Sequence, residues 1–240
     1  MPGTKRILIA GAGIGGLALA HALRRGGLEV VVYERDPTPS ARDQGYRLHI
    51  DRNGNAALRA CLSAEALDLV RRTSGVNDDV VAAYTHRLVE VMTQTFPGVT
   101  DDLITCVDCD TFRRGLLTGL GDDVGFGRAV TGYRITEAGR VRVEFAGGGA
   151  DEGDLLVGAD GAWSAVRRQL LPHATVRDLG VRCVYGRLPI GPATEDVIPS
   201  TISHGFSWVS DDTGCGAGFA PVRFRTRPAH ASDSLRVTLV

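Results

Sequence analysis

The sequence has no long hydrophobic run. A helix needs about 18 consecutive apolar residues to cross a bilayer, and no stretch of this 240-residue chain approaches that length. The first residues lead directly into a short strand pattern, without the apolar core of a signal peptide. We therefore expect a cytoplasmic protein that does not associate with a membrane.

The sequence also lacks an excess of charge of either sign. Its 27 Lys and Arg residues balance 28 Asp and Glu residues, for a formal net charge of −1. The arginines are scattered, so no basic block favours nucleic acid as a partner. With 43% hydrophobic residues and no repeat, the chain can bury a core of one large domain or one and a half ordinary ones.

The cysteines show no disulfide framework and no metal-ligand spacing. There are five, an odd number without regular intervals, which is typical of free thiols in a reducing compartment. Cys106-Val-Asp-Cys109 has the C-x-x-C form, but no thioredoxin-like setting or second ligand pair accompanies it. We expect no metal site, and packing or surface roles for the isolated His204, His230, Trp163 and Trp208.

What the sequence does contain is a glycine-rich turn near its start. The apolar run Ile7–Ala10 predicts a buried strand that leads into the G-x-G-x-x-G pattern, Gly11-Ala12-Gly13-Ile14-Gly15-Gly16. Gly11 permits a tight turn, Gly13 lets backbone N–H groups approach a pyrophosphate, and Gly16 lets a helix lie close on the strand. The start of that helix would face the phosphates with its partial positive charge.

The residues that follow complete a strand–helix–strand unit. Apolar positions from Leu17 to Leu23 predict an amphipathic helix that ends at Gly26-Gly27, and Val30–Tyr33 predicts a second buried strand. Glu34 closes that strand 23 residues after Gly11, where such units place an acid that accepts hydrogen bonds from an adenosine ribose. The stretch therefore predicts a dinucleotide site.

The next segment, up to residue 120, predicts a loop, two strands and two helices. The polar loop Pro37–Gly45 carries Arg42, and Arg47 follows in a short strand, Tyr46–Ile50; either arginine could approach a pyrophosphate or lie on the surface. We expect one helix from a cap at Asn53–Asn55 through Val70, an edge strand at Leu88–Thr95, and a helix at Thr111–Leu120 capped by Asp110 or Thr111.

A second motif follows three strand signals. Val124–Thr136, Arg140–Phe145 and Gly153–Gly158 are separated by glycine turns and favour a β-meander. The third signal ends at Asp160-Gly161, and Ser164 can open a helix. Because open α/β sheets bind ligands at the carboxyl ends of their strands, we expect Asp160-Gly161 to form a second wall of the nucleotide site. Further strands are predicted at 181–188, 202–210 and 216–224.

Together these motifs resemble the single-component (class A) FAD-dependent monooxygenases, the para-hydroxybenzoate hydroxylase-like family. The resemblance rests on Gly11–Gly16, Glu34-Arg35 and Leu155–Arg167, which agree in order and spacing. It implies an α/β fold with α+β elements: a Rossmann-like βαβ unit, an antiparallel β-meander insertion and the start of a substrate-covering antiparallel sheet. It also implies a discontinuous FAD-binding domain at 1–175, with 75–100 on the substrate side, and a partial substrate-binding sheet at 176–240.

The resemblance further implies FAD as cofactor, NAD(P)H as co-substrate, and hydroxylation of an aromatic or polyketide-like small molecule with O₂. Because the flavin carries this chemistry, we assign no catalytic base. The cofactor-binding residues that it implies, with the basic residues nearby, are Gly11, Gly13, Ile14, Gly15, Gly16, Glu34, Arg35, Arg42, Arg47, Arg113, Asp160 and Gly161.

The chain departs from the family pattern at two points. Cys109 stands where family members carry an arginine beside the flavin, and Arg113 follows as a substitute or as the second arginine of that pattern. The Gly-Asp-Ala-type motif that follows in family members does not occur before Val240. The alternatives are therefore a truncated, non-catalytic FAD-binding remnant, or another flavin enzyme on the same scaffold, such as a halogenase or a reductase.

Overall fold

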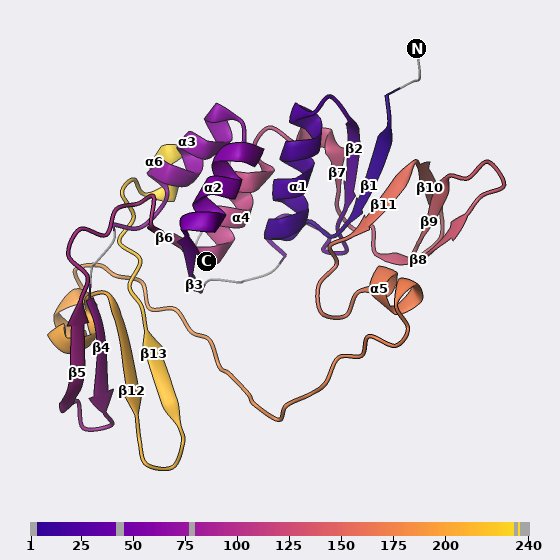
Figure 1. Cartoon of the computed structure of the whole chain (residues 1–240). Helices are drawn as coiled ribbons and strands as arrows, with labels where there is room; N and C mark the ends of the chain where they lie inside the picture. The colour runs from indigo at the N-terminus through magenta and orange to yellow at the C-terminus, as the bar shows by residue number, and fades with distance from the viewer. Residues whose placement is uncertain (1–3, 42–45, 77–79, 233–234, 236–240) are drawn as a thin grey trace. The chain divides into compact units, whose positions relative to one another are not determined.

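The chain forms two compact units, each built from three separate stretches. The computed structural model describes residues 4–41, 46–76, 80–232 and 235. Unit 1 comprises Met1–Gln44, Leu58–Val70 and Phe112–Cys183. Unit 2 comprises Gly45–Ala57, Arg71–Thr111 and Val184–Val240. The elements of both units are labelled in Figure 1.

A four-stranded parallel sheet organises unit 1. Its order is β11-β1-β2-β7, with β1 at Arg6–Ala10, β2 at Glu29–Tyr33, β7 at Val124–Gly125 and β11 at Leu155–Gly158. Ala10, the last residue of β1, is aligned with Tyr33 of β2 on one side and Gly158 of β11 on the other. The carboxyl ends of three strands therefore meet, at the kind of edge where open α/β sheets bind ligands.

Helix α1 (Ile14–Arg25) joins β1 to β2 as the sequence predicts. Leu17 and Ala20 are fully buried on the side of α1 that packs on these strands. The N–H of Gly27, which has a φ of 77°, donates to the carbonyl of Arg24 at 2.9 Å. This left-handed residue lets the chain leave the helix and enter β2, because glycine adopts a positive φ without steric cost.

A second, antiparallel sheet of unit 1 has the order β10-β9-β8. Its strands are β8 (Val130–Ile135), β9 (Val141–Phe145) and β10 (Ala150–Gly153). Val143 and Phe145 form one buried cluster with Leu8 and Tyr33 of the parallel sheet, so this cluster holds the two sheets together. Burial of such side chains stabilises a fold by roughly 1.5–3 kcal/mol each.

Two of the three predicted meander strands prove to be divided. Residues 124–136 separate into β7 and β8, and residues 153–158 separate at Asp154 into the end of β10 and the whole of β11. The Asp154 side chain accepts a hydrogen bond from the N–H of Arg6 at 2.8 Å, and its own N–H donates to the Arg6 carbonyl at 2.8 Å. These bonds bring β11 beside β1, so the expected third meander strand instead joins the parallel sheet.

The predicted helix from Asn53–Asn55 through Val70 is two helices, α2 (Arg52–Cys61) and α3 (Ala64–Arg72). The second begins after Ser63, whose hydroxyl accepts a hydrogen bond from the N–H of Ala66 at 3.2 Å. The first is capped not by an asparagine but by Asp51, which accepts from the N–H of Gly54 at 2.8 Å. A side-chain acceptor of this kind satisfies an N–H that has no partner within the helix.

The helix predicted at Thr111–Leu120 is α4 (Cys109–Leu117). Its cap is Asp108, which accepts hydrogen bonds from the N–H of Thr111 at 2.9 Å and from the Thr111 hydroxyl at 2.8 Å. The predicted caps, Asp110 and Thr111, lie inside the helix. By contrast, α5 (Ala165–Leu170) begins as predicted, because the Ser164 hydroxyl accepts from the N–H of Arg167 at 2.9 Å.

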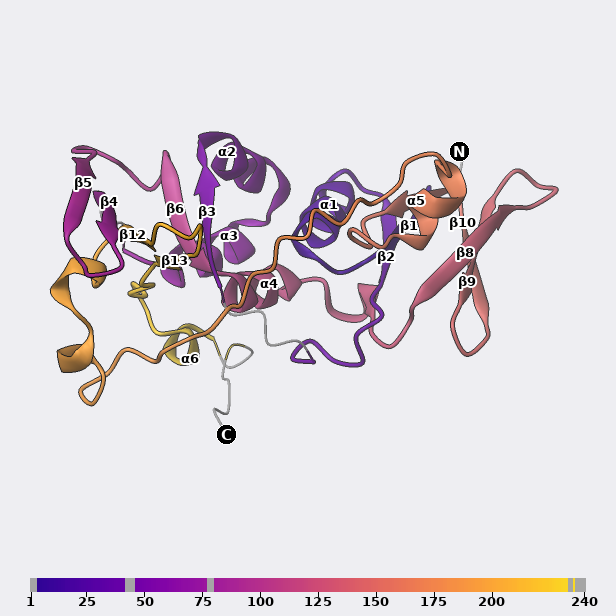
Figure 2. The same cartoon turned by 90° about the horizontal axis from the view of Figure 1, so that it is seen from below.

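Unit 2 contains a four-stranded sheet of order β13-β12-β4-β5. These strands, β4 (Val80–Thr85), β5 (Glu90–Thr95), β12 (Phe206–Ser210) and β13 (Gly216–Phe219), lie side by side in Figures 1 and 2. β5 is an exposed edge strand, as predicted, whereas the predicted strand at 181–188 is wrong: those residues form no strand, and Val184 is 96% exposed. Alternating apolar residues make a strand only where a neighbouring strand pairs with them.

Shorter elements complete unit 2 and the rest of the fold. β3 (Arg47–Asp51) and β6 (Ile104–Asp108) form an antiparallel pair, and α6 spans Pro228–Ala231. Single 3₁₀ turns occupy Gly121–Asp123, Glu195–Val197 and Ser200–Ile202. Within the described residues, every helix is too short or too polar to span a membrane.

Candidate functional site

The glycine turn at the end of β1 packs tightly against the end of β11. Gly11 has a φ of 103°, and its N–H donates to the Tyr33 carbonyl at 2.7 Å. A Cβ at Gly11 would collide with the carbonyl of Ala159 and come within 2.9 Å of Asp160 Cα. A Cβ at Gly16 would collide with the Gly11 carbonyl. These two glycines are therefore required by packing alone.

Gly13 and Gly15 have a different environment. A Cβ at either position would have no neighbour within 4 Å, and Gly13 has a φ of −78°, which any residue can adopt. Within the described chain, no side chain caps the start of α1, and its first turn has no acidic residue. The N-terminus of this twelve-residue helix therefore offers open space and a partial positive charge to an anion.

The Glu34 carboxylate lies beside this turn and is buried, with 4% of the residue exposed. Its Oε2 accepts a hydrogen bond from the N–H of Ala12 at 2.9 Å, and its Oε1 accepts from the N–H of Asp36 at 3.0 Å. An ionised carboxylate has about four acceptor positions, so it can serve ligand hydroxyls in addition to main-chain donors.

Arg113 of α4 is buried in the same place, with 6% of the residue exposed. Its Nε donates to the Ala12 carbonyl at 2.8 Å, its Nη1 donates to the Pro39 carbonyl at 2.9 Å, and its Nη2 lies 3.6 Å from Glu34 Oε2. The guanidinium thus joins the glycine turn, the acid and the loop after β2.

Asp160 and Gly161 follow β11 directly. Asp160 Oδ2 accepts a hydrogen bond from the N–H of Ala165 at 2.7 Å, whereas its Oδ1 is buried and has no hydrogen-bond partner in the described structure. Gly161 has a φ of 81°, so glycine suits this turn. An unsatisfied buried acceptor beside an open helix N-terminus fits a ligand that carries both hydroxyl groups and phosphates.

The remaining predicted site residues are Arg35, Arg42 and Arg47. Arg35 is exposed next to Glu34, and Arg42 lies outside the described residues. Arg47 belongs to unit 2, where its guanidinium donates to the Gly205 carbonyl and to Cys106 Sγ. Cys109, also in unit 2, is buried, and its hydrogen bond with the Tyr46 hydroxyl raises the pKa of that tyrosine.

Sequence reasoning missed the residues that contribute through their main chain. Ala12 provides both an N–H and a carbonyl, Asp36 provides an N–H, and Pro39 provides a carbonyl. Of these three residues, only Ala12 had a signal in the sequence, its position between two glycines. Any residue type can make a main-chain contact, so the sequence does not mark such contacts.

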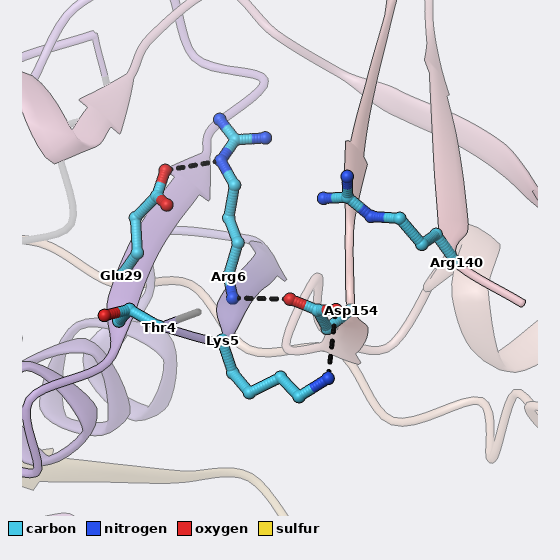
Figure 3. A pocket seen from close by; sticks show the side chains of 6 residues that line it. All are labelled: Thr4, Lys5, Arg6, Glu29, Arg140 and Asp154. Atoms are coloured by element: carbon cyan, nitrogen blue, oxygen red, sulfur yellow. Dashed lines mark hydrogen bonds and ion pairs between the residues drawn. The ribbon is translucent and has the colours of Figure 1, made fainter. Parts of the chain in front are cut away.

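A pocket of about 320 Å³ lies at the opposite, amino end of β1, and Figure 3 shows its lining. Four of its charged side chains form ion pairs: Arg6 Nε donates to Glu29 at 2.6 Å, and Lys5 lies 3.4 Å from Asp154. It is an open, polar hollow away from the glycine turn, and nothing in its lining matches the chemistry of a nucleotide site.

The chain is similar to known proteins in both sequence and structure. Residues 9–63 match the family model of the NAD(P)-binding Rossmann-like domain. A dual O-methyltransferase/FAD-dependent monooxygenase of Phaeosphaeria nodorum is 37% identical over 194 residues, which are 78% of this chain and 21% of that protein.

Two solved structures show the same fold. A protein of Photorhabdus luminescens assigned as an FAD-containing monooxygenase has a TM-score of 0.69 and 28% identity, over 87% of this chain and 54% of its own. A 2-methyl-3-hydroxypyridine-5-carboxylic acid oxygenase variant has a TM-score of 0.58 and 26% identity, over 70% of this chain and 43% of its own. The chain therefore spans about a fifth of its curated relative and about half of these solved chains. By sequence and by fold, the chain is similar to FAD-dependent monooxygenases, in agreement with the resemblance that its motifs showed.

Proposed function

We propose that unit 1 binds the ADP half of FAD, and that the protein is an NAD(P)H-dependent monooxygenase. The observation that carries the proposal is the meeting of the Gly11–Gly16 turn, Glu34 and Asp160-Gly161 at the carboxyl ends of β1, β2 and β11. The relatives named above are FAD-dependent or FAD-containing enzymes, which supports FAD over a nicotinamide dinucleotide as the ligand held here.

Each group of the site has a role in this proposal. Glu34 accepts hydrogen bonds from the adenosine ribose, because its carboxylate lies at the end of β2, bonded to the main chain of the glycine turn through the N–H of Ala12. Gly13, Ile14 and Gly15 bring main-chain N–H groups and the start of α1 to the pyrophosphate. Asp160 Oδ1, buried without a partner in the described structure, accepts from a cofactor hydroxyl. Arg35 and Arg42 are the basic side chains proposed to lie near the phosphates.

When bound, FAD supplies the redox chemistry: it takes two electrons from NAD(P)H and activates O₂, so that one oxygen atom enters the substrate and the other leaves as water. The protein binds and orients the cofactor and the substrate. We propose residues 1–175 as the FAD-binding domain, with 75–100 and 176–240 on the substrate side.

The proposed substrate is an aromatic or polyketide-like small molecule. Support comes from the 2-methyl-3-hydroxypyridine-5-carboxylic acid oxygenase, which is named for a heteroaromatic acid. A panel of phenols, hydroxypyridine acids and hydroxylated polyketide aromatics would cover this class.

The experiment is to purify the full chain, reconstitute it with FAD and record flavin absorbance, then follow NADH and NADPH oxidation and O₂ uptake with each compound. We expect bound flavin, and oxidation that a substrate accelerates. Asp160→Asn, which keeps the shape of the side chain but loses its charge, should weaken FAD binding. A folded chain that takes up no FAD refutes the proposal, and bound FAD without stimulated oxidation assigns a non-catalytic flavin-binding role.

A further inference from the structure

We propose that Arg113 is a positioning residue that aims the N–H of Gly13 at the diphosphate without touching the cofactor. The inference rests on the proposed function, since it deepens the account of the same site. It differs from the sequence expectation, in which Arg113 was a candidate for direct contact with the cofactor. In the structure, Nε and Nη1 donate to main-chain carbonyls, whereas Nη2 is buried 3.6 Å from Glu34 Oε2 without a hydrogen-bond partner among the described residues.

Ala12 is held at both its N–H and its carbonyl. Glu34 accepts from the N–H at 2.9 Å, and Arg113 Nε donates to the carbonyl at 2.8 Å. Both contacts are buried and link segments far apart in sequence, 22 and 101 residues from Ala12. The residue between the first two glycines of the turn therefore has a fixed orientation.

This orientation determines where Gly13 points its N–H. A peptide bond is planar and trans, so the carbonyl of Ala12 and the N–H of Gly13 point in opposite directions. Because the Ala12 carbonyl faces Arg113, the Gly13 N–H faces away from it. The space around Gly13 is open, with nothing within 4 Å of a Cβ built there. The donor thus points away from Arg113, at the open glycine turn where we place the diphosphate.

Arginine suits this task better than lysine. Its planar fork donates to two carbonyls from different segments while a third nitrogen lies 3.6 Å from Glu34. The side chains of this ion pair are only 7% and 6% exposed, so its attraction is little screened by water. A lysine would keep the charge, but a compact ammonium cannot donate to both carbonyls in this geometry and also lie beside Glu34.

The test measures FAD affinity by quenching of flavin fluorescence in the full chain and in Arg113→Lys and Arg113→Met. We expect Arg113→Met to weaken FAD binding about ten- to a hundredfold, the loss that follows from removing a charge-assisted hydrogen bond. Arg113→Lys should fall between Arg113→Met and the wild type. Leu116→Ala is the matched control, because Leu116 is fully buried on the same helix and its truncation lowers stability without touching the turn.

Two results would overturn the proposal: wild-type affinity in folded Arg113→Met, or an equal loss of affinity in Leu116→Ala. A second readout needs no cofactor. Amide hydrogen exchange of Ala12, whose N–H donates to Glu34, should speed up in Arg113→Met more than in Leu116→Ala, and equal exchange in the two variants would also refute the positioning role. If the wild type binds no FAD, the proposed function fails, while this exchange measurement still tests the role of Arg113 in the turn.

Discussion

The main-chain N–H of Ala12 donates a hydrogen bond of 2.9 Å to the carboxylate of Glu34. The acid at the end of β2 therefore holds the glycine turn at the end of β1, in addition to its proposed contact with a ribose. If the proposed ribose contact holds, binding and folding are coupled at Glu34, because one side chain then serves both the protein and the cofactor.

Replacement of Glu34 by alanine should lower both stability and FAD affinity. The N–H groups of Ala12 and Asp36 lose their acceptor, and the buried Arg113 loses its ion-pair partner. We expect the free energy of unfolding to fall by about 3 kcal/mol, measured by denaturant titration without FAD. Arg35→Ala, an exposed neighbour, is the control and should leave stability unchanged. Equal stability of Glu34→Ala and the wild type would show that these bonds contribute little.

Substitutions at two glycines of the turn should separate binding from folding. Gly13→Ala adds a methyl group in open space at an ordinary φ, so the unfolding temperature should stay near that of the wild type while FAD affinity drops. Gly16→Ala should destabilise the fold itself, because its Cβ would collide with the Gly11 carbonyl. Thermal unfolding and flavin titration of both variants check this. Unchanged FAD affinity in Gly13→Ala would mean that no ligand approaches the turn there.

Asp151 should make the stability depend on acidic pH. Its hydrogen bonds with Arg6 and with the Tyr33 hydroxyl lower the pKa of its carboxyl to about 2, from an ordinary value of 3.8. Because the unfolded chain binds a proton at a higher pH than the folded chain does, stability is complete above about pH 4 and falls between pH 4 and 2. In denaturant titrations over this range, the free energy of unfolding should fall less steeply with decreasing pH in Asp151→Asn than in the wild type. An equally steep fall in both proteins would contradict this account.

His21 should produce a second pH dependence, near neutrality. Burial, and then the charge of Arg24, lower the pKa of its imidazole from 6.5, while its Nε2 bonds the Leu116 carbonyl at 2.8 Å. The unfolded chain therefore takes up a proton first as the pH falls through 6.5, and stability decreases below that pH. In His21→Gln, the free energy of unfolding should change less between pH 7 and pH 5 than it does in the wild type, as denaturant titrations would show. Part of the slope should remain, because burial also lowers the pKa of His49.

Much of unit 1 could be predicted from the sequence because its signals are local. The strand–glycine–helix unit needs only neighbouring residues: a short apolar run, glycines at three positions, a helical period and a closing acid. The cap at Ser164 is equally local, and the structure confirms it. A local hydrogen bond also explains why α3 begins after Ser63 as a separate helix from α2. The sequence contains this serine cap, but the apolar pattern continues through it and therefore predicted a single helix.

The sequence by itself determined the turn, its two flanking strands and the acid, because each depends on the backbone preferences of residues close in the chain. Tertiary structure decided the rest. β11 belongs to the parallel sheet rather than to the predicted meander because Asp154 forms a hydrogen bond with Arg6, 148 residues away. Arg113 contacts Ala12 and Glu34 because α4 places it beside them, although it lies 101 residues after Ala12 in the chain. Contacts between distant segments depend on the packing of the whole unit, so no local pattern specifies them.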